Sequence, residues 1–127
     1  MSPVALLHGV PEGGASASRA GGARVEWMTR GHLYLRAEPG KRDELLRTLD
    51  QLAVLDAKRR QPGFLAAEIQ LPLEDDERLL VWSSWASREH YERWLAGPAG
   101  QGMLREIRTL LAEEPVWRLY QVVDAIN

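Results

Sequence analysis

The chain has 127 residues, sixteen of them basic and eighteen acidic, and it contains no cysteine. This length suits one domain with a single core, and the near-neutral charge supplies no basic stripe for phosphates, so we expect no nucleic-acid partner. The lack of cysteine excludes disulfides and thiol catalysis. No apolar run approaches the ~20 residues that span a bilayer, so we expect a cytoplasmic protein with no membrane partner.

The N-terminal segment is rich in glycine, alanine and serine. Such a segment buries too little apolar surface to offset the entropy that is lost on ordering. We therefore expect a flexible tail over residues 1–24 and a folded domain over residues 25–127.

The first strand is predicted over His32–Arg36, where apolar and polar side chains alternate. Leu33 and Leu35 share one face of this strand. The other face carries the polar set His32, Tyr34 and Arg36.

A long amphipathic helix is predicted between Pro39-Gly40, where proline suits the first turn, and Pro62-Gly63, which end it. Its apolar stripe consists of Leu45, Leu46, Leu49, Leu52, Ala53 and Ala57. The basic run Lys58-Arg59-Arg60 near its end is interpreted as a partner of the negative end of the helix dipole and as a solvated surface, with anion binding as the alternative.

The second half of the chain predicts strands over Phe64–Leu71 and Arg78–Ser84, joined as a hairpin by an acidic turn. A short helix follows over Ser87–Leu95, with Ser87 as its N-cap. A second amphipathic helix then spans Met103–Leu111, and Val116–Val123 is the last strand.

This order of elements is that of a ferredoxin-like β-α-β-β-α-β domain of the α+β class, with a four-stranded antiparallel sheet and the helices on one face. The stretch from Leu79 to Trp85 carries no charge, which is typical of a strand covered on both faces. Because the helices cover only one face, we expect a second copy of the chain to cover the other, as a homodimer.

Three motifs carry a resemblance to a known family. They are P-G-K at the start of the long helix, Q-P-G-F at its end, and the segment V-W-S-S-W-A-S-R-E-H-Y-E-R-W-L-A-G-P. The region from about Gly31 to Val123 resembles the antibiotic biosynthesis monooxygenase family of the dimeric α/β-barrel superfamily. The resemblance implies a homodimer with a pocket between each sheet and its helices. It also implies activities such as cofactor-independent oxygenation of phenols and quinols, or haem degradation.

The resemblance, together with the polar and aromatic side chains that remain where the histidines common in the family are replaced, suggests site residues. His90 and Tyr91 are the predicted catalytic residues, because an imidazole or a phenol hydroxyl can take the proton of an acidic phenol. The predicted substrate-binding residues are Leu33, Trp82, Trp85, Trp94 and Leu104. Trp94 matches a tryptophan of the haem-degrading relatives, whereas Leu33 and Leu104 occupy the positions of their asparagine and iron-binding histidine. Iron then lacks a ligand, so haem degradation is disfavoured, and we expect neither a cofactor nor a metal site.

The leading functional hypothesis is therefore a cofactor-independent monooxygenase that acts on an aromatic phenol, quinol or polyketide-type molecule. The alternative is a non-catalytic dimeric domain that binds an apolar or aromatic small molecule. At the residue level, the alternatives are an exposed first-turn position for His90 and a core or dimer-contact role for the tryptophans.

Overall fold

The structure, a computed structural model, describes residues 28–126. The predicted tail over residues 1–24 and the first residues of the predicted domain lie outside the described range. The described elements are β1 (Thr29–Arg36), α3 (Arg42–Gln51), α4 (Val54–Arg59), β2 (Phe64–Gln70), β3 (Arg78–Trp85), α5 (Arg88–Ala96), α6 (Pro98–Ile107), the 3-10 turn η2 (Arg108–Leu110) and β4 (Val116–Gln121).

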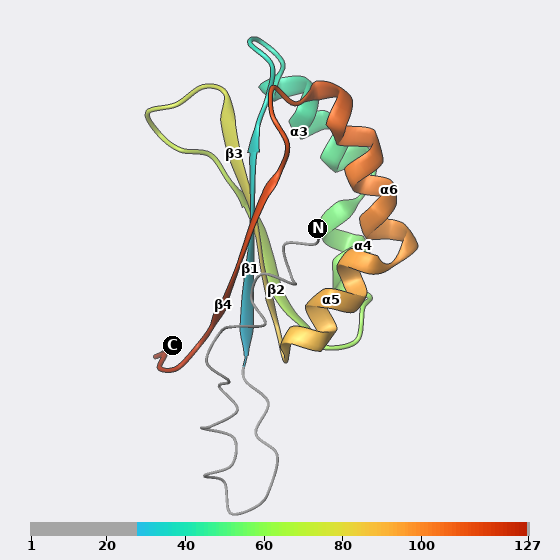
Figure 1. Cartoon of the computed structure of the whole chain (residues 1–127), viewed down its shortest axis with the longest axis vertical. Helices are drawn as coiled ribbons and strands as arrows, with labels where there is room; N and C mark the ends of the chain where they lie inside the picture. Colours follow the sequence, from blue (N-terminus) through green and yellow to red (C-terminus); the bar gives the residue numbers. More distant parts are fainter. Residues whose placement is uncertain (1–27, 127) are drawn as a thin grey trace, which may run out of the picture.

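The four strands form one antiparallel sheet in the order β2-β3-β1-β4. The four described α-helices all lie on the same side of this sheet, as Figure 1 shows. This arrangement confirms the predicted ferredoxin-like α+β fold. Within residues 28–126, none of the helices combines the length and apolar character that crossing a lipid bilayer requires.

The strand alternation that defines the core is the predicted one. In β1, Leu33 and Leu35 are 4 % and 2 % exposed, and they pair with Val81 and Leu79 of β3. Side chains at odd-numbered positions of β1 and β3 thus face the helices, because neighbours in register share a face. Burial of this apolar layer against the helices is the main source of stability for such a domain.

The predicted long helix is wrong as a single element. Ala53 has φ 51° and ψ 47°, a left-handed conformation that interrupts the helix between α3 and α4. The start is also later than predicted, because Pro39 and Gly40 form a turn and α3 begins at Arg42. The sequence has neither glycine nor proline at the break, and its apolar residues keep their helical spacing across it. For this reason the sequence predicted one continuous helix.

The helix ends near α5 follow local capping rules. The Ser87 Oγ accepts a hydrogen bond from the backbone N–H of His90, which confirms Ser87 as an N-cap. Gly97 separates α5 from α6, and Pro98 occupies the first turn of α6. These two caps fix the direction in which α5 and α6 cross the sheet.

Candidate functional site

Aromatic side chains fill the space between the sheet and the helices. Trp85 on β3 is fully buried, and Trp94 and Tyr91 on α5 are each 3 % exposed. The rings of Trp85 and Trp94 stack with centroids 6.4 Å apart, and Tyr91 meets Trp85 edge to face at 6.2 Å. Phe64 meets Trp85 edge to face at 5.5 Å. We call these four residues the aromatic cluster; their rings pack against one another, three of them in the core, and Trp94 also borders the opening described below.

Polar contacts and a glycine hold the cluster in place. The indole N–H of Trp85 donates to the Ser83 Oγ at 2.9 Å, so its burial leaves no orphan donor. A Cβ at Gly31 would lie only 2.5 Å from a ring carbon of Tyr91, so the Tyr91 ring rests on the bare backbone of β1. Burial raises the pKa of the Tyr91 hydroxyl, which therefore stays protonated at neutral pH.

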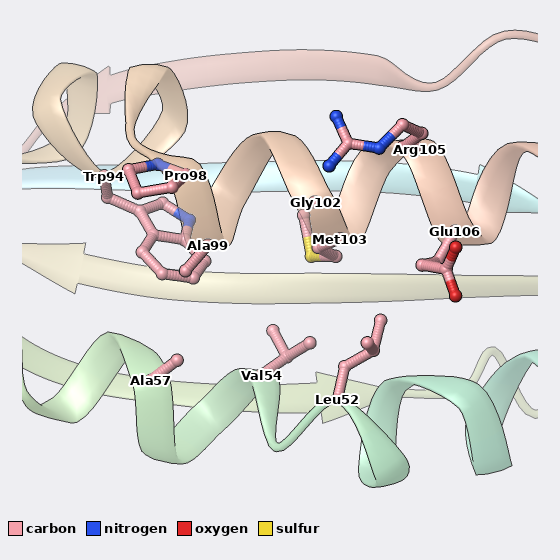
Figure 2. A pocket seen from close by; sticks show the side chains of 10 residues that line it. All are labelled: Leu52, Val54, Ala57, Trp94, Pro98, Ala99, Gly102, Met103, Arg105 and Glu106. Atoms are coloured by element: carbon pink, nitrogen blue, oxygen red, sulfur yellow. The ribbon is translucent and has the colours of Figure 1, made fainter.

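A groove of about 300 Å³ opens between α4 and α6, with Trp94 at one end (Figure 2). Leu52, Val54 and Ala57 line one wall. The α6 wall consists of Pro98, Ala99, Gly102, Met103, Arg105 and Glu106. In Figure 2 the two charged residues of this wall lie at the end remote from Trp94. We call this space the inter-helix groove; its volume suits a small aromatic molecule.

The inter-helix groove is open because small residues line it. Ala57, Ala99 and Gly102 present one carbon or none, so the walls stand apart between Trp94 and Met103. A Cβ added at Gly102 would meet only the Arg105 side chain, at 3.8 Å. These small residues were not among the predicted site residues; the signal in the sequence was the glycine-rich stretch G-P-A-G-Q-G at the start of an amphipathic helix.

Lys58 is a second feature that the sequence analysis missed. Its side chain is 3 % exposed, and its Nζ lies 5.6 Å from the centroid of the Trp94 ring. Burial lowers the pKa of Lys58 to about 7, since an ammonium loses its hydration there without gaining an anionic partner.

The interpretation of the basic run as a solvated helix end is thus wrong for Lys58 and fits its neighbours. Arg59 and Arg60 both pair with Asp56 and remain exposed. The left-handed residue before α4 turns Val54 and Lys58, which are four residues apart, toward the core. A side chain that would face solvent on one continuous helix is therefore buried.

The structure separates His90 from the groove. The His90 Nδ1 lies 2.7 Å from the Ser87 Oγ, and a Cβ at Gly63 would lie 2.2 Å from the imidazole ring. The half-buried ring is therefore held between the α5 cap and the loop that leads into β2. His90 does not line the inter-helix groove.

Trp82 and Trp85 face opposite sides of the sheet, as their spacing in a strand requires. The Arg30 guanidinium lies 5.2 Å from the Trp82 ring on the side without helices. We call that side the helix-free face; its β1, β3 and β4 residues are Arg30, His32, Tyr34, Arg36, Arg78, Leu80, Trp82, Ser84, Val116, Arg118 and Tyr120. Of the predicted binding residues, the structure thus brings Trp85 and Trp94 together and leaves Trp82 elsewhere.

The helix-free face contains partly buried polar atoms. The Arg30 Nε and the His32 Nδ1 are buried without a hydrogen-bond partner. Burial, and then the nearby Arg30 charge, lower the pKa of His32, so its imidazole is mainly neutral at pH 7. The ring meets Tyr120 edge to face at 5.0 Å.

Leu33 and Leu104 are core residues, 4 % and 3 % exposed. Neither offers a ligand atom for iron. Residues 28–126 contain no cluster of three or more histidine, aspartate or glutamate side chains with the geometry to hold a metal ion. The donor set of the described chain thus does not suit haem iron bound at the Leu104 position.

Fold and groove together define a small α+β domain with a ligand-sized opening between its helices. A family model described as antibiotic biosynthesis monooxygenase matches residues 28–105, which include the strands β1 to β3, α5 and most of α6. The chain belongs to the antibiotic biosynthesis monooxygenase family.

Solved structures share this fold. A protein from Chloroflexus aurantiacus, described as a candidate antibiotic biosynthesis monooxygenase, is 24 % identical, with a TM-score of 0.62 over 79 % of this chain and 97 % of its own. SnoaB from Streptomyces nogalater, described as a cofactor-independent oxygenase, is 18 % identical, with a TM-score of 0.65 over 78 % and 96 %. A search of curated protein sequences found no match.

Proposed function

We propose that this protein is a cofactor-independent monooxygenase that acts on an aromatic phenol, quinol or polyketide-type small molecule in the inter-helix groove. The observation that carries the proposal is the groove itself, which is apolar along most of its length and ends on the Trp94 indole. Membership of the antibiotic biosynthesis monooxygenase family supports this reading. A flat aromatic substrate would bind there because its ring would stack on an aromatic side chain and because its apolar surface would be removed from water.

The proposed reaction needs no external reductant. One atom of O₂ enters the substrate, and the other leaves as water with two hydrogen atoms that the substrate itself supplies. Loss of the phenolic proton makes the ring electron-rich and is the step at which a protein base contributes. The chain also excludes water from the ring through Trp94, Val54 and Met103, which line the groove.

The predicted catalytic residues fit this scheme unequally. Tyr91 belongs to the aromatic cluster, and its raised pKa keeps the hydroxyl protonated, so it could donate a hydrogen bond but would not act as a base at neutral pH. His90 lies against Gly63 and Ser87, so a substrate in the groove would not touch it in this arrangement. Their catalytic roles remain predictions.

A specific observation also favours the second candidate function, a non-catalytic domain that binds an apolar or aromatic small molecule. None of the histidines within residues 28–126 lines the inter-helix groove, and the chamber below the helices is filled by the aromatic cluster. Such a protein would bind the same compounds and leave them unchanged.

We further propose that the helix-free face pairs with a second copy of the chain. Tyr34, Tyr120 and Val116 are 42 %, 49 % and 37 % exposed there, on a sheet face that no described helix covers. Pairing would also offer partners to the orphan atoms of Arg30 and His32.

Oxygen uptake with a panel of anthrones and hydroquinones tests the proposed function. We expect consumption above the buffer rate for the unmodified protein and a loss of at least about tenfold in Gly102→Leu, whose side chain would fill the open groove. Ala96→Leu adds the same side chain at an exposed site on α5 and serves as the control. Quenching of tryptophan fluorescence without oxygen uptake would instead establish the binding function.

A further inference from the structure

Lys58 is a buried cation next to the inter-helix groove. The chain has two lysines; Lys41 is exposed and pairs with Glu44, whereas Lys58 is buried. No described residue accepts a hydrogen bond from Lys58 or forms an ion pair with it, and its one polar contact is with the Trp94 ring. A buried ammonium without an anion is destabilising, whereas a methionine of similar shape would fill the same space at no such cost.

Lys58 also lies beside the groove. Val54, one turn earlier on the same face of α4, and Ala57, the preceding residue, both line the groove. Trp94 is shared, since it lines the groove and lies 5.6 Å from the Lys58 Nζ. A ligand stacked on Trp94 would thus be separated from the amine by little more than one aromatic ring.

We propose that Lys58 is the charge partner of an acidic aromatic ligand in the inter-helix groove, so that the ligand binds as an anion and Lys58 as an ammonium. For a phenol, the ligand releases its O–H proton to water and Nζ takes up a proton from water, so the net change is one proton moved and no oxidation state changes. This inference rests on the proposed function for the location of the ligand, and it adds the ligand's charge class and a residue that recognises it.

Other charged groups near α4 do not serve this purpose. Arg105 and Glu106 are exposed at the far end of the groove, where solvent weakens their fields. The remaining titratable residues on the elements around Lys58 are Arg42, Asp43, Glu44, Arg47, Asp50, Asp56, Arg59, Glu68, Arg88, Glu89, His90, Tyr91, Glu92 and Arg93. None of them contributes to the lowered pKa of Lys58, which has burial as its cause.

Two redox-inert probes of matched shape test the proposal, 2-naphthoate and the neutral 2-naphthamide. Binding is followed by quenching of tryptophan fluorescence at pH 6, where Lys58 is mainly an ammonium, and at pH 9, where it is mainly neutral. We expect about a tenfold preference for naphthoate at pH 6, the scale of one charge pair roughly 10 Å apart at an effective dielectric constant of ~20, and a smaller preference at pH 9.

Lys58→Met removes the charge and keeps the length of the side chain. This variant should bind both probes equally at both pH values, whereas Arg105→Met should retain the preference of the unmodified protein. If Lys58→Met prefers naphthoate over naphthamide as strongly as the unmodified protein does, the proposal is overturned. The absence of any naphthoate binding would also overturn it.

A measurement on the unmodified protein removes dependence on the variant's folding. The ¹³Cε resonance of Lys58, titrated by NMR, should report a pKa that rises when naphthoate binds, because the anion stabilises the ammonium. An unchanged pKa at saturating naphthoate would contradict the proposal. Oxygen uptake is a separate readout, so charge-selective binding without turnover would uphold the role of Lys58 and reject the monooxygenase.

Discussion

At the scale of single residues, Lys58 connects the energetics of the fold with the candidate site. Burial lowers its pKa from 10.5 to about 7. In the unfolded chain the amine keeps its ordinary pKa, so between these values the unfolded state binds a proton that the folded state does not. The free energy of unfolding therefore rises with pH in this window and falls as the pH drops toward 7.

We expect this group to contribute an increase of about 3 kcal/mol in the free energy of unfolding between pH 7 and pH 9.5. Tyr91 has the opposite effect at higher pH, because its raised pKa makes the unfolded chain lose the proton first. Urea denaturation at several pH values, followed by circular dichroism, measures the slope. Lys58→Met should abolish this slope and be more stable at pH 7, while Lys41→Met should keep it. A slope that persists in Lys58→Met would contradict the assignment.

Among the secondary-structure elements, the break between α3 and α4 determines where one wall of the inter-helix groove lies. Ala53 occupies a left-handed conformation that costs a residue with a Cβ roughly 1–2 kcal/mol. This break lets Val54 line the groove and Lys58 enter the core. On one continuous helix, the side chains of Val54 and Lys58 would point in a different direction from the one that the structure shows.

Glycine substitutions distinguish the broken helix from a continuous one. Ala53→Gly should leave the free energy of unfolding unchanged or raise it by up to about 1 kcal/mol, because glycine adopts the left-handed conformation without a Cβ clash. Ala57→Gly, within α4, should lower it by about 1 kcal/mol. Equal destabilisation by both substitutions, measured by chemical denaturation, would indicate one continuous helix.

At the scale of the whole molecule, the sheet has one face against the helices and one that no described helix covers (Figure 1). The helix-free face mixes aromatic side chains with arginines, and Arg30 stacks on Trp82 there. Two copies related by a two-fold axis would bury this face between them.

We expect the unmodified protein to sediment as a dimer at micromolar concentration and Trp82→Glu to sediment as a folded monomer, because a buried carboxylate would oppose pairing. Leu73→Glu, at a loop position that is 101 % exposed, is the control and should remain dimeric. Sedimentation velocity with circular dichroism on the same samples reports both mass and folding. A monomeric unmodified protein would refute the pairing.

Local patterns in the sequence were enough to predict the fold class and the layout of the core. Alternation in β1, helical spacing in α5 and the Ser87 cap are local properties, because each depends on residues within one or two turns of the chain. The opposite faces of Trp82 and Trp85 also follow from their spacing in one strand. The family resemblance rested on the same local motifs, and the match over residues 28–105 bears it out.

The surroundings of the candidate site depend on how distant elements pack against one another and could not be predicted from local patterns. Whether Lys58 meets solvent or Trp94 depends on a helix break without glycine or proline and on an aromatic ring from α5, both invisible to periodicity. The groove likewise exists because small residues of α6 stand opposite α4 across a gap. Periodicity fixes the direction of a side chain within its own element, but burial, pKa and open volume depend on the atoms that other elements place against it.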